Sequence, residues 1–422
     1  MKKLCRSGRC RQSPEWGGNS LVKNARSLLC RGRGTGYAFG GDGTGKFMAA
    51  STEDKSTTAA RMKTGQKRET NYELLRITAM FMVVCLHYLS HAGALTVPGE
   101  SAGGTQILGD FLEALCIVAV NVYVLITGWF QSQTEFHGRK LIRLMAEILF
   151  YTLLIPAGLS ILGTAPAAKS VWDRWFWFFP VSMEAYWFIT AYVILYLFSP
   201  FLNAGLRALP RKQAGRLILV LLFFFCVLPS VSPVKLTIDR AGYDFVWFAV
   251  IYLIAGYLRR YGCPRLEKRT AAAGLYLGSS LLLWVYTVML HLVSMRGALL
   301  YYANVPYHYN FLLTLTASLG LFYWFRGFHV PEGKAAEFIR RAAPSTLGVY
   351  LIHENIDIRD RWLPLMERFL GPVPRGGLLV LHMLICAALL YICCTLIDVV
   401  RRILFSRCGQ GLYALSDRRR GR

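Results

Sequence analysis

Long apolar stretches separated by short polar segments fill most of the chain. A transmembrane helix needs about 20 consecutive, mostly apolar residues, and a scan at that length gives about ten candidates. The fifth and ninth are the weakest, and the ninth is short and ends in charged residues. This pattern predicts an all-α fold, a polytopic membrane helix bundle of about ten transmembrane helices. The candidates cover roughly residues 74–95, 107–130, 141–163, 184–204, 215–232, 244–261, 271–293, 307–326, 344–358 and 378–404.

The loops between these candidates alternate in their content of Lys and Arg. Cytoplasmic loops of membrane proteins are enriched in these residues. Basic residues precede the first candidate and follow the second, fourth, sixth, eighth and tenth, whereas the loop after the first has neither Lys nor Arg. The loop after the ninth is an exception, because it carries Arg359, Arg361, Arg368 and Arg375. The alternation predicts that both termini are cytoplasmic in a multi-pass protein of the cell membrane.

The composition also indicates a membrane protein. Hydrophobic residues make up 54% of the chain and charged residues 17%, whereas about 25% of the residues in soluble domains are charged. The formal net charge is +24, and much of it lies in the first 61 residues and in the loops. Because basic residues in those places match anionic lipid headgroups, we expect the lipid bilayer as a partner and no binding of nucleic acid.

The 11 cysteines do not have the spacing of a disulfide framework or of a metal site. No Cys-x-x-Cys pair and no Cys/His zinc spacing occurs, so we expect no structural metal and no disulfide framework. Inside apolar stretches Cys behaves as a small hydrophobic residue. The cysteines in such stretches are Cys85, Cys116, Cys226, Cys386, Cys393 and Cys394.

The two ends of the chain differ from its apolar middle. The first 61 residues are rich in Gly, Arg, Ser and Lys and lack periodicity, so we expect residues 1–67 to form a disordered basic tail. A native chain that starts at Met62 is a second interpretation of this segment. Residues 68–405 then form the membrane domain, and residues 406–422 form a basic cytoplasmic C-terminal tail.

The first apolar stretch contains two residues that are costly inside a membrane, Arg76 and His87. An ionisable residue in a membrane helix is a candidate functional residue. Eleven residue steps of about 100° bring Arg76 and His87 to the same helix face, about 16 Å apart along the axis. The loop charges place Arg76 at the cytoplasmic mouth and His87 about three turns deeper.

His87 is the candidate general base. Histidine has an ordinary pKa near 6.5, which suits proton transfer at neutral pH, and an imidazole in mid-membrane needs a partner or a water-filled cavity. His91 lies one turn further on the same face, and Glu73 lies one turn before Arg76, where it can pair with the guanidinium. An Arg at a helix end also serves as an interface anchor, and this alternative stays open for Arg76.

These residues and several later motifs resemble acyltransferase family 3, whose membrane proteins O-acylate surface sugars and related acceptors with acyl-CoA. That family carries Arg or Lys, ten residues and then His on its first helix. The chain departs from the family pattern at Thr127, where the family has Ser, and at Arg139-Lys140, where it has two Arg. The resemblance covers about residues 68–405. The matching segments are Arg76–His87, Asn121–Phe130, Arg139–Arg143, Tyr186–Tyr192, Ser199–Phe201 and Gly348–His353.

The resemblance implies acyl-CoA as a co-substrate from the cytosol and no permanently bound cofactor. Arg76, together with Arg139, Lys140 and Arg143, would bind the phosphates of CoA. The pantetheine arm is comparable in length to the separation of Arg76 and His87, so the thioester would reach the imidazole. The acyl group is expected to be acetyl, the default of the family.

Four further residues are candidates for contacts with the acceptor: Glu184, Asn121, Tyr192 and His353. Tyr192 belongs to a matching motif, and His353 ends the late one. Glu184 has the alternative of a surface carboxylate at a helix start. Asn121 has the alternative of an interhelical hydrogen bond.

Together these features predict an enzyme, a membrane O-acyltransferase that transfers an acyl group from acyl-CoA to a hydroxyl of an exported glycan or cell-envelope polymer. The alternative is a transporter or flippase subunit that moves a glycan or small solute, because buried His and Arg also suit a transport path. The lack of an internal repeat argues against it. A third interpretation, a structural assembly partner, leaves His87 unexplained.

Overall fold

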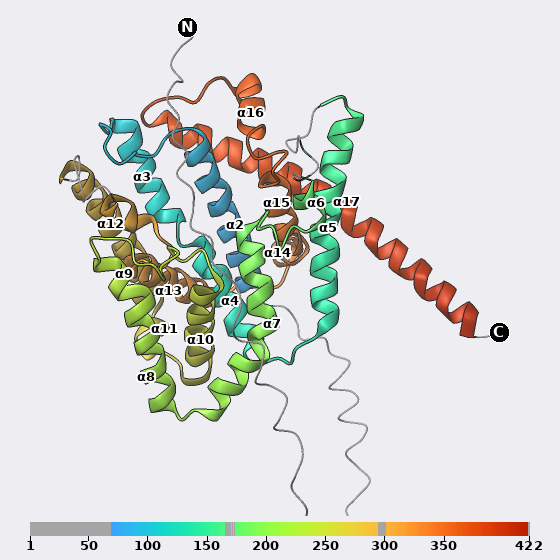
Figure 1. Ribbon diagram of the computed structural model, residues 1–422, viewed down its shortest axis with the longest axis horizontal. Coiled ribbons are helices and arrows are strands. Elements are labelled where there is room, and N and C mark those ends of the chain that lie inside the picture. The colour runs from blue at the N-terminus through green and yellow to red at the C-terminus, as the bar shows by residue number, and fades with distance from the viewer. Residues whose placement is uncertain (1–68, 165–169, 171, 173, 294–300, 421–422) are drawn as a thin grey trace, which may run out of the picture. The chain divides into compact units, whose positions relative to one another are not determined.

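The computed structural model describes residues 69–164, 170, 172, 174–293 and 301–420, and no strand occurs among them. The chain folds into helices joined by loops (Figure 1). The predicted tail of residues 1–67 lies outside the described residues. The predicted C-terminal tail begins within the last helix, which continues to Arg420.

Seven helical segments in the described part of the chain are long and apolar enough to cross a membrane. The all-α membrane bundle is therefore confirmed, while the count of ten and the cytoplasmic termini stay predictions. The second span joins two helices, and the fifth contains a π-helical turn. The seven segments are Thr70–His91, Gly104–Gln131, Gly138–Ile161, Trp187–Ala208, Arg211–Val231, Arg269–Val293 and Leu378–Ser406.

The helices follow the labels of Figure 1. Their bounds are α2 (Thr70–His91), α3 (Gly104–Cys116), α4 (Ala119–Gln131), α5 (Gly138–Ile161), α6 (Trp175–Phe178), α7 (Trp187–Ala208), α8 (Arg211–Leu222), η1 (Phe223–Val227), α9 (Leu228–Val231), α10 (Phe245–Tyr261), α11 (Pro264–Glu267), α12 (Arg269–Val293), η3 (Tyr302–Tyr307), α13 (Leu312–Arg326), α14 (Lys334–Ala342), η4 (Ala343–Ser345), α15 (Thr346–His353), α16 (Trp362–Leu370) and α17 (Leu378–Arg420).

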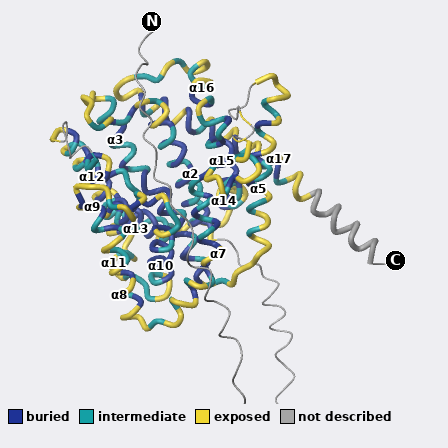
Figure 2. Tube along the Cα trace, viewed as in Figure 1, coloured by how far each residue is buried: buried dark blue, intermediate teal, exposed yellow. Residues whose placement is uncertain are grey.

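Three of the predicted candidates correspond to shorter helices, α10, α13 and α15. α10 has 17 residues, α13 has 15 and α15 has eight. Buried residues occupy most of α10 and nearly all of α15 (Figure 2). A helix that is apolar on all sides packs inside a bundle. These three helices are shorter than the seven segments above, and their place among the ten predicted spans stays a prediction.

The ends of α10 have identifiable sequence causes. The Asp244 side chain accepts a hydrogen bond from the backbone N–H of Trp247 and caps the first turn, which is a common way to start a helix. The helix ends at Gly262, whose φ of 70° lies in the left-handed region that glycine adopts without strain.

Glycines allow close approach of the central helices. A Cβ at Gly128 would lie 2.8 Å from the Cβ of Ala255, where α4 packs on α10. A Cβ at Gly320 would lie 2.5 Å from the backbone N of Tyr276, where α13 packs on α12. Small residues drive such contacts in membrane proteins, because van der Waals packing has to replace the hydrophobic effect.

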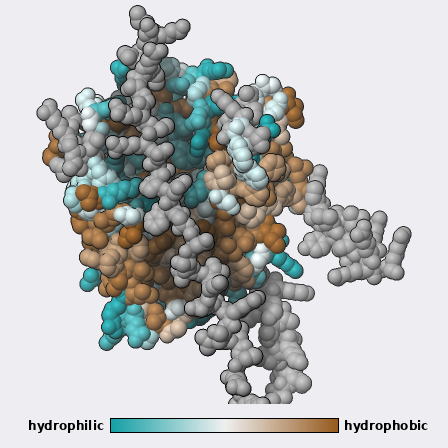
Figure 3. Space-filling view, viewed as in Figure 1, coloured by the Kyte–Doolittle hydropathy of each residue, from teal (hydrophilic) through white to brown (hydrophobic). Residues whose placement is uncertain are grey.

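Apolar side chains cover the outside of the bundle. Leu219 on α8, Leu282 on α12 and Leu396 on α17 are all exposed. Hydrophobic residues form a band across the middle of the face shown in Figure 3, with hydrophilic residues above and below it. This surface suits the hydrocarbon core of a bilayer.

α2 lies at the centre of the bundle and packs against α3, α4, α13, α14, α15 and α17. At its start, Asn71 donates a hydrogen bond to the carbonyl of Arg326 at the end of α13. Thr70 accepts one from Arg340 of α14. We call this end of the bundle the Arg76 end and the opposite end the His91 end.

Candidate active site

A cavity of about 530 Å³ runs along α2 inside the bundle. Its lining residues on α2 recur every three or four positions, with Leu86 and His87 adjacent at the end, and therefore share one helix face. The first and last of them are about 21 Å apart along the helix axis. The sequence predicts Arg76 and His87 on one helix face, and both residues line this cavity. The α2 lining residues are Glu73, Arg76, Met80, Val83, Leu86 and His87.

The cavity is basic at the Arg76 end. Arg76 Nη1 lies 2.8 Å from Glu73 Oε1, so the predicted pairing with Glu73 is confirmed. Lys140, on the first turn of α5, also lines the cavity. Arg139 and Arg143 are exposed on α5 and do not belong to the lining. The structure therefore brings two of the four predicted phosphate-binding residues together.

At the other end, His87 forms a hydrogen-bonded pair with His353. His87 Nδ1 lies 2.8 Å from His353 Nε2, and His353 Nδ1 lies 2.6 Å from the carbonyl oxygen of Val349. A carbonyl only accepts, so the neutral His353 carries its proton on Nδ1 and presents Nε2 as an acceptor. His87 must then donate from Nδ1, which leaves its Nε2 unprotonated. The pair assigns His87 the tautomer of a base.

His353 therefore lies behind His87 rather than on the cavity surface. Its side chain is fully buried, and it is absent from the cavity lining. Glu354, the next residue, places Oε1 3.7 Å from His87 Nδ1. Sequence reasoning missed Glu354 as a neighbour of His87. The only available signal was the charge at the end of the ninth apolar stretch.

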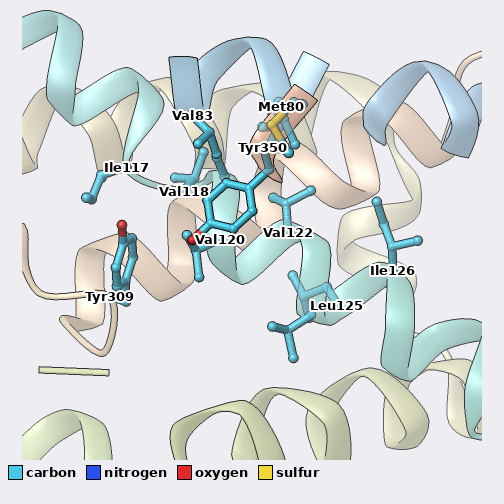
Figure 4. Close-up of a cluster of buried hydrophobic side chains, with 14 of the residues drawn as sticks. Met80, Val83, Ile117, Val118, Val120, Val122, Leu125, Ile126, Tyr309 and Tyr350 are labelled. Carbon is cyan, nitrogen blue, oxygen red and sulfur yellow. The ribbon is translucent and has the colours of Figure 1, made fainter. Parts of the chain in front are cut away.

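Aromatic residues form much of the remaining lining. Tyr192, a predicted acceptor contact, lines the cavity and stacks on Phe188 at a ring-centroid distance of 6.0 Å. Tyr350 and Tyr309 lie among the apolar side chains around the His87 end (Figure 4). The sequence assigns no role to either, although Tyr350 lies in the matching segment Gly348–His353, because aromatic residues in an apolar stretch normally belong to the core.

The other two predicted acceptor contacts lie outside the cavity. Glu184 is exposed in the turn before α7, with a φ of 50°. Asn121 is fully buried, donates to the carbonyl of Tyr309 at 2.8 Å and accepts from the indole of Trp247 at 3.1 Å. The interhelical hydrogen bond considered for Asn121 is thus present, between α4 and α10.

A second cavity of about 330 Å³ lies at the His91 end. His91, one turn beyond His87 on α2, lines it together with Arg359, Asp360 and Glu367. His91 Nδ1 lies 3.9 Å from Asp360 Oδ1. Most of the lining comes from residues 359–373, within the loop whose basic residues are an exception to the alternation of loop charges. Arg359 of this loop therefore belongs to a site that contains both positive and negative side chains.

Comparison with known proteins adds one match. The family model of the acyltransferase domain, Acyl_transf_3, matches residues 69–399. No curated protein and no solved structure matches the chain. The matched region contains every residue that lines the two cavities.

Proposed function

Because the chain belongs to acyltransferase family 3, we propose that it transfers an acetyl group from cytosolic acetyl-CoA to a hydroxyl of an exported glycan or cell-envelope polymer. The chain is a multi-pass membrane protein. It is an acyltransferase that transfers groups other than amino-acyl groups. The acetyl donor, the glycan acceptor and the roles of the residues below are the proposed part.

One observation carries the proposal. A single cavity joins basic side chains, Arg76 and Lys140, to the imidazole of His87, whose Nε2 is free to accept a proton. A donor with phosphates at one end and a thioester at the other matches this arrangement. The Arg76 end would then face the cytosol, as the loop charges indicate.

The donor would lie along α2. Arg76 and Lys140 would hold phosphates of CoA at the mouth. A guanidinium has five N–H donors, so the pairing of Arg76 with Glu73 through Nη1 is compatible with this role. The pantetheine arm would follow the apolar lining at Met80 and Val83 and bring the thioester carbonyl to His87.

In the reaction, His87 Nε2 accepts the proton of the acceptor hydroxyl while the hydroxyl oxygen attacks the thioester carbonyl. The C–S bond breaks, and the proton passes from His87 to the sulfur, so the products are the ester and CoA with a free thiol. During this step His87 carries positive charge. The hydrogen bond to His353 keeps the ring in place, and the nearby carboxylate of Glu354 stabilises that charge.

The acceptor would approach from the second cavity, one turn of α2 away from His87. Its lining combines the donors of Arg359 with the carboxylates of Asp360 and Glu367. Mixed donors and acceptors of nearly balanced charge suit a hydroxyl-rich chain better than a strongly anionic one. This geometry supports a glycan acceptor that comes from the side opposite the donor.

The test is transfer of label in isolated membranes that contain the full-length chain. Membranes are incubated with acetyl-CoA labelled in the acetyl group, and label in extracted glycan is measured. We expect transfer with the unaltered chain and loss of it in His87→Ala, while the exposed His137→Ala serves as a control for loss of an imidazole. Retained transfer in His87→Ala would overturn the mechanism, and solute flux that depends on His87 without label in glycan would support the transporter instead.

A further inference from the structure

The cavity ends at the level of His87. On α2 the lining stops there, and the next residue of the same face, His91, lines the second cavity. α15 ends beside His87 because His353 bonds to it, and its last lining residue is Tyr350. α7 begins at the same level, since Tyr186 donates a hydrogen bond to the carbonyl of Leu351.

The lining residues at this end of the cavity come from different helices. They are Val120 as the first on α4, Trp187 as the first on α7, Tyr350 on α15, and Tyr309 just before α13. We call these four side chains the floor of the cavity. Figure 4 shows the ring of Tyr350 beside Val83 and Val120, with Tyr309 further away, on the side of Ile117.

The floor is tightly packed. Trp187 stacks on Tyr309 with ring centroids 5.4 Å apart and an interplanar angle of 26°. Tyr350, Tyr309 and Val120 are all buried. Bulky aromatic groups packed on one another leave little room for further atoms, because protein interiors are close-packed and yield only at a cost.

Hydrogen bonds hold the floor from behind. The carbonyl of Tyr309 accepts a hydrogen bond from the side chain of Asn121. The backbone N–H of Tyr309 donates a hydrogen bond to the carbonyl of Ala241 at 3.0 Å. A Cβ at Gly242 would lie 2.8 Å from the Cβ of Tyr309, so glycine allows this loop to approach. Tyr309 is thus fixed at its backbone, and its ring packs against Trp187.

We propose that this floor limits the acyl group to a short one, which makes Val120, Trp187, Tyr309 and Tyr350 determinants of donor specificity. The inference rests on the proposed function, since it assumes that the thioester carbonyl lies at His87. An acetyl group ends within the space beside His87, whereas a longer acyl chain would have to displace the floor. A mismatch of one methylene in such a pocket changes rates by about 10-fold or more.

The test compares donors of different length in membranes that contain the full-length chain. Acetyl-, butyryl- and octanoyl-CoA, each labelled in the acyl group, are supplied, and initial rates of transfer to glycan are measured. We expect the unaltered chain to use acetyl-CoA at least about tenfold faster than octanoyl-CoA. Val120→Ala and Trp187→Leu enlarge the floor and should raise the octanoyl-to-acetyl rate ratio by about tenfold.

Phe130→Leu is the matched control, because it removes an aromatic ring from the lining at the Arg76 end. It should leave the ratio unchanged whatever it does to the total rate. A partly unfolded variant loses both rates together, so the ratio remains informative. For a variant without turnover, displacement of labelled acetyl-CoA from the purified full-length protein by octanoyl-CoA is measured instead, and stronger displacement than with the unaltered chain is expected.

Two results would overturn the inference: octanoyl transfer as fast as acetyl transfer in the unaltered chain, or enlarged-floor variants whose donor preference stays that of the unaltered chain. Failure of the proposed function looks different. In that case no donor labels glycan in the unaltered chain, or the labelling persists in His87→Ala.

Discussion

At the scale of single residues, the hydrogen-bonded pair of His87 and His353 sets the chemistry of the cavity. The pair depends on one proton at His353 Nδ1, which the carbonyl of Val349 holds. A base whose tautomer is fixed in this way is ready before the substrate arrives, and loss of the fixing partner leaves part of the population in the wrong tautomer. His353 is therefore a positioning residue in the proposed reaction.

His353→Ala should lower kcat by roughly 10²–10⁴-fold, the usual contribution of a well-placed acid or base. Because His353 does not line the cavity, the KM values for donor and acceptor should change little. Steady-state rates at varied acetyl-CoA and glycan concentrations check this. A raised KM for the acceptor at unchanged kcat would instead return His353 to the acceptor site expected from the sequence.

Arg76→Ala should weaken use of the donor. A hydrogen bond to a charged group contributes about 1.5–3 kcal/mol, so the KM for acetyl-CoA should rise by about 10–150-fold with a smaller effect on kcat. Arg143→Ala is the matched control, since Arg143 lies on the exposed surface of α5 outside the cavity. Equal effects of the two variants would mean that the donor binds across the α5 surface instead of in the cavity mouth.

The residue scale also shows where sequence reasoning stops. Arg76 and His87 are eleven positions apart on one helix, so helix geometry alone puts them on one face. His353 is 266 positions from His87, and no local pattern links them. The same holds for Tyr309 and Trp187, whose contact joins the start of α7 to the loop before α13.

At the scale of helices, a buried ionic network joins α17 to α5. Arg401 contacts Asp398 on its own helix at 2.8 Å and Glu147 on α5 at 2.9 Å. Tyr151 donates to Asp398, and a Cβ at Gly348 would lie 2.3 Å from Asp398 Oδ1. The network therefore lies directly against α15, the helix that carries His353.

Arg401→Ala should destabilise the protein by about 3–5 kcal/mol, because it leaves buried carboxylates without their cation. Thermal unfolding of the detergent-purified protein measures the loss. Arg402→Ala is the control, since Arg402 donates hydrogen bonds to Ser345 and to the carbonyl of Arg341, whereas Arg401 donates to Asp398 and Glu147. Similar unfolding temperatures for both variants would contradict a stabilising role of the network.

The helices also show which part of the fold the apolar pattern predicts. Long stretches such as 74–95 and 378–404 became α2 and α17, because they have both the length and the composition of a span. α10, α13 and α15 are just as apolar, yet they are shorter and packed inside the bundle. Hydropathy measures transfer from water and does not distinguish lipid from a protein core. The apolar pattern alone therefore does not separate a helix that faces lipid from one that is packed inside the bundle.

At the scale of the whole molecule, the two cavities follow one direction along α2. The first runs from Arg76 to His87, and the second begins at His91, so the reacting groups lie between two separate approaches. In the proposed reaction, the donor would enter from one side of the membrane and the acceptor from the other, so the two substrates would not share one opening. The proposed reaction with cytosolic acyl-CoA requires the Arg76 end to face the cytosol.

That orientation is testable with single added cysteines in intact cells. Ser101→Cys lies in the exposed loop at the His91 end, and Gln133→Cys lies in the exposed loop between α4 and α5 at the Arg76 end. A membrane-impermeant thiol reagent should label Ser101→Cys in intact cells and Gln133→Cys only after permeabilisation. The unaltered chain gives the background from its own cysteines. Labelling in the reverse order would place Arg76 outside the cell, away from cytosolic acyl-CoA, and would exclude the proposed direction of transfer.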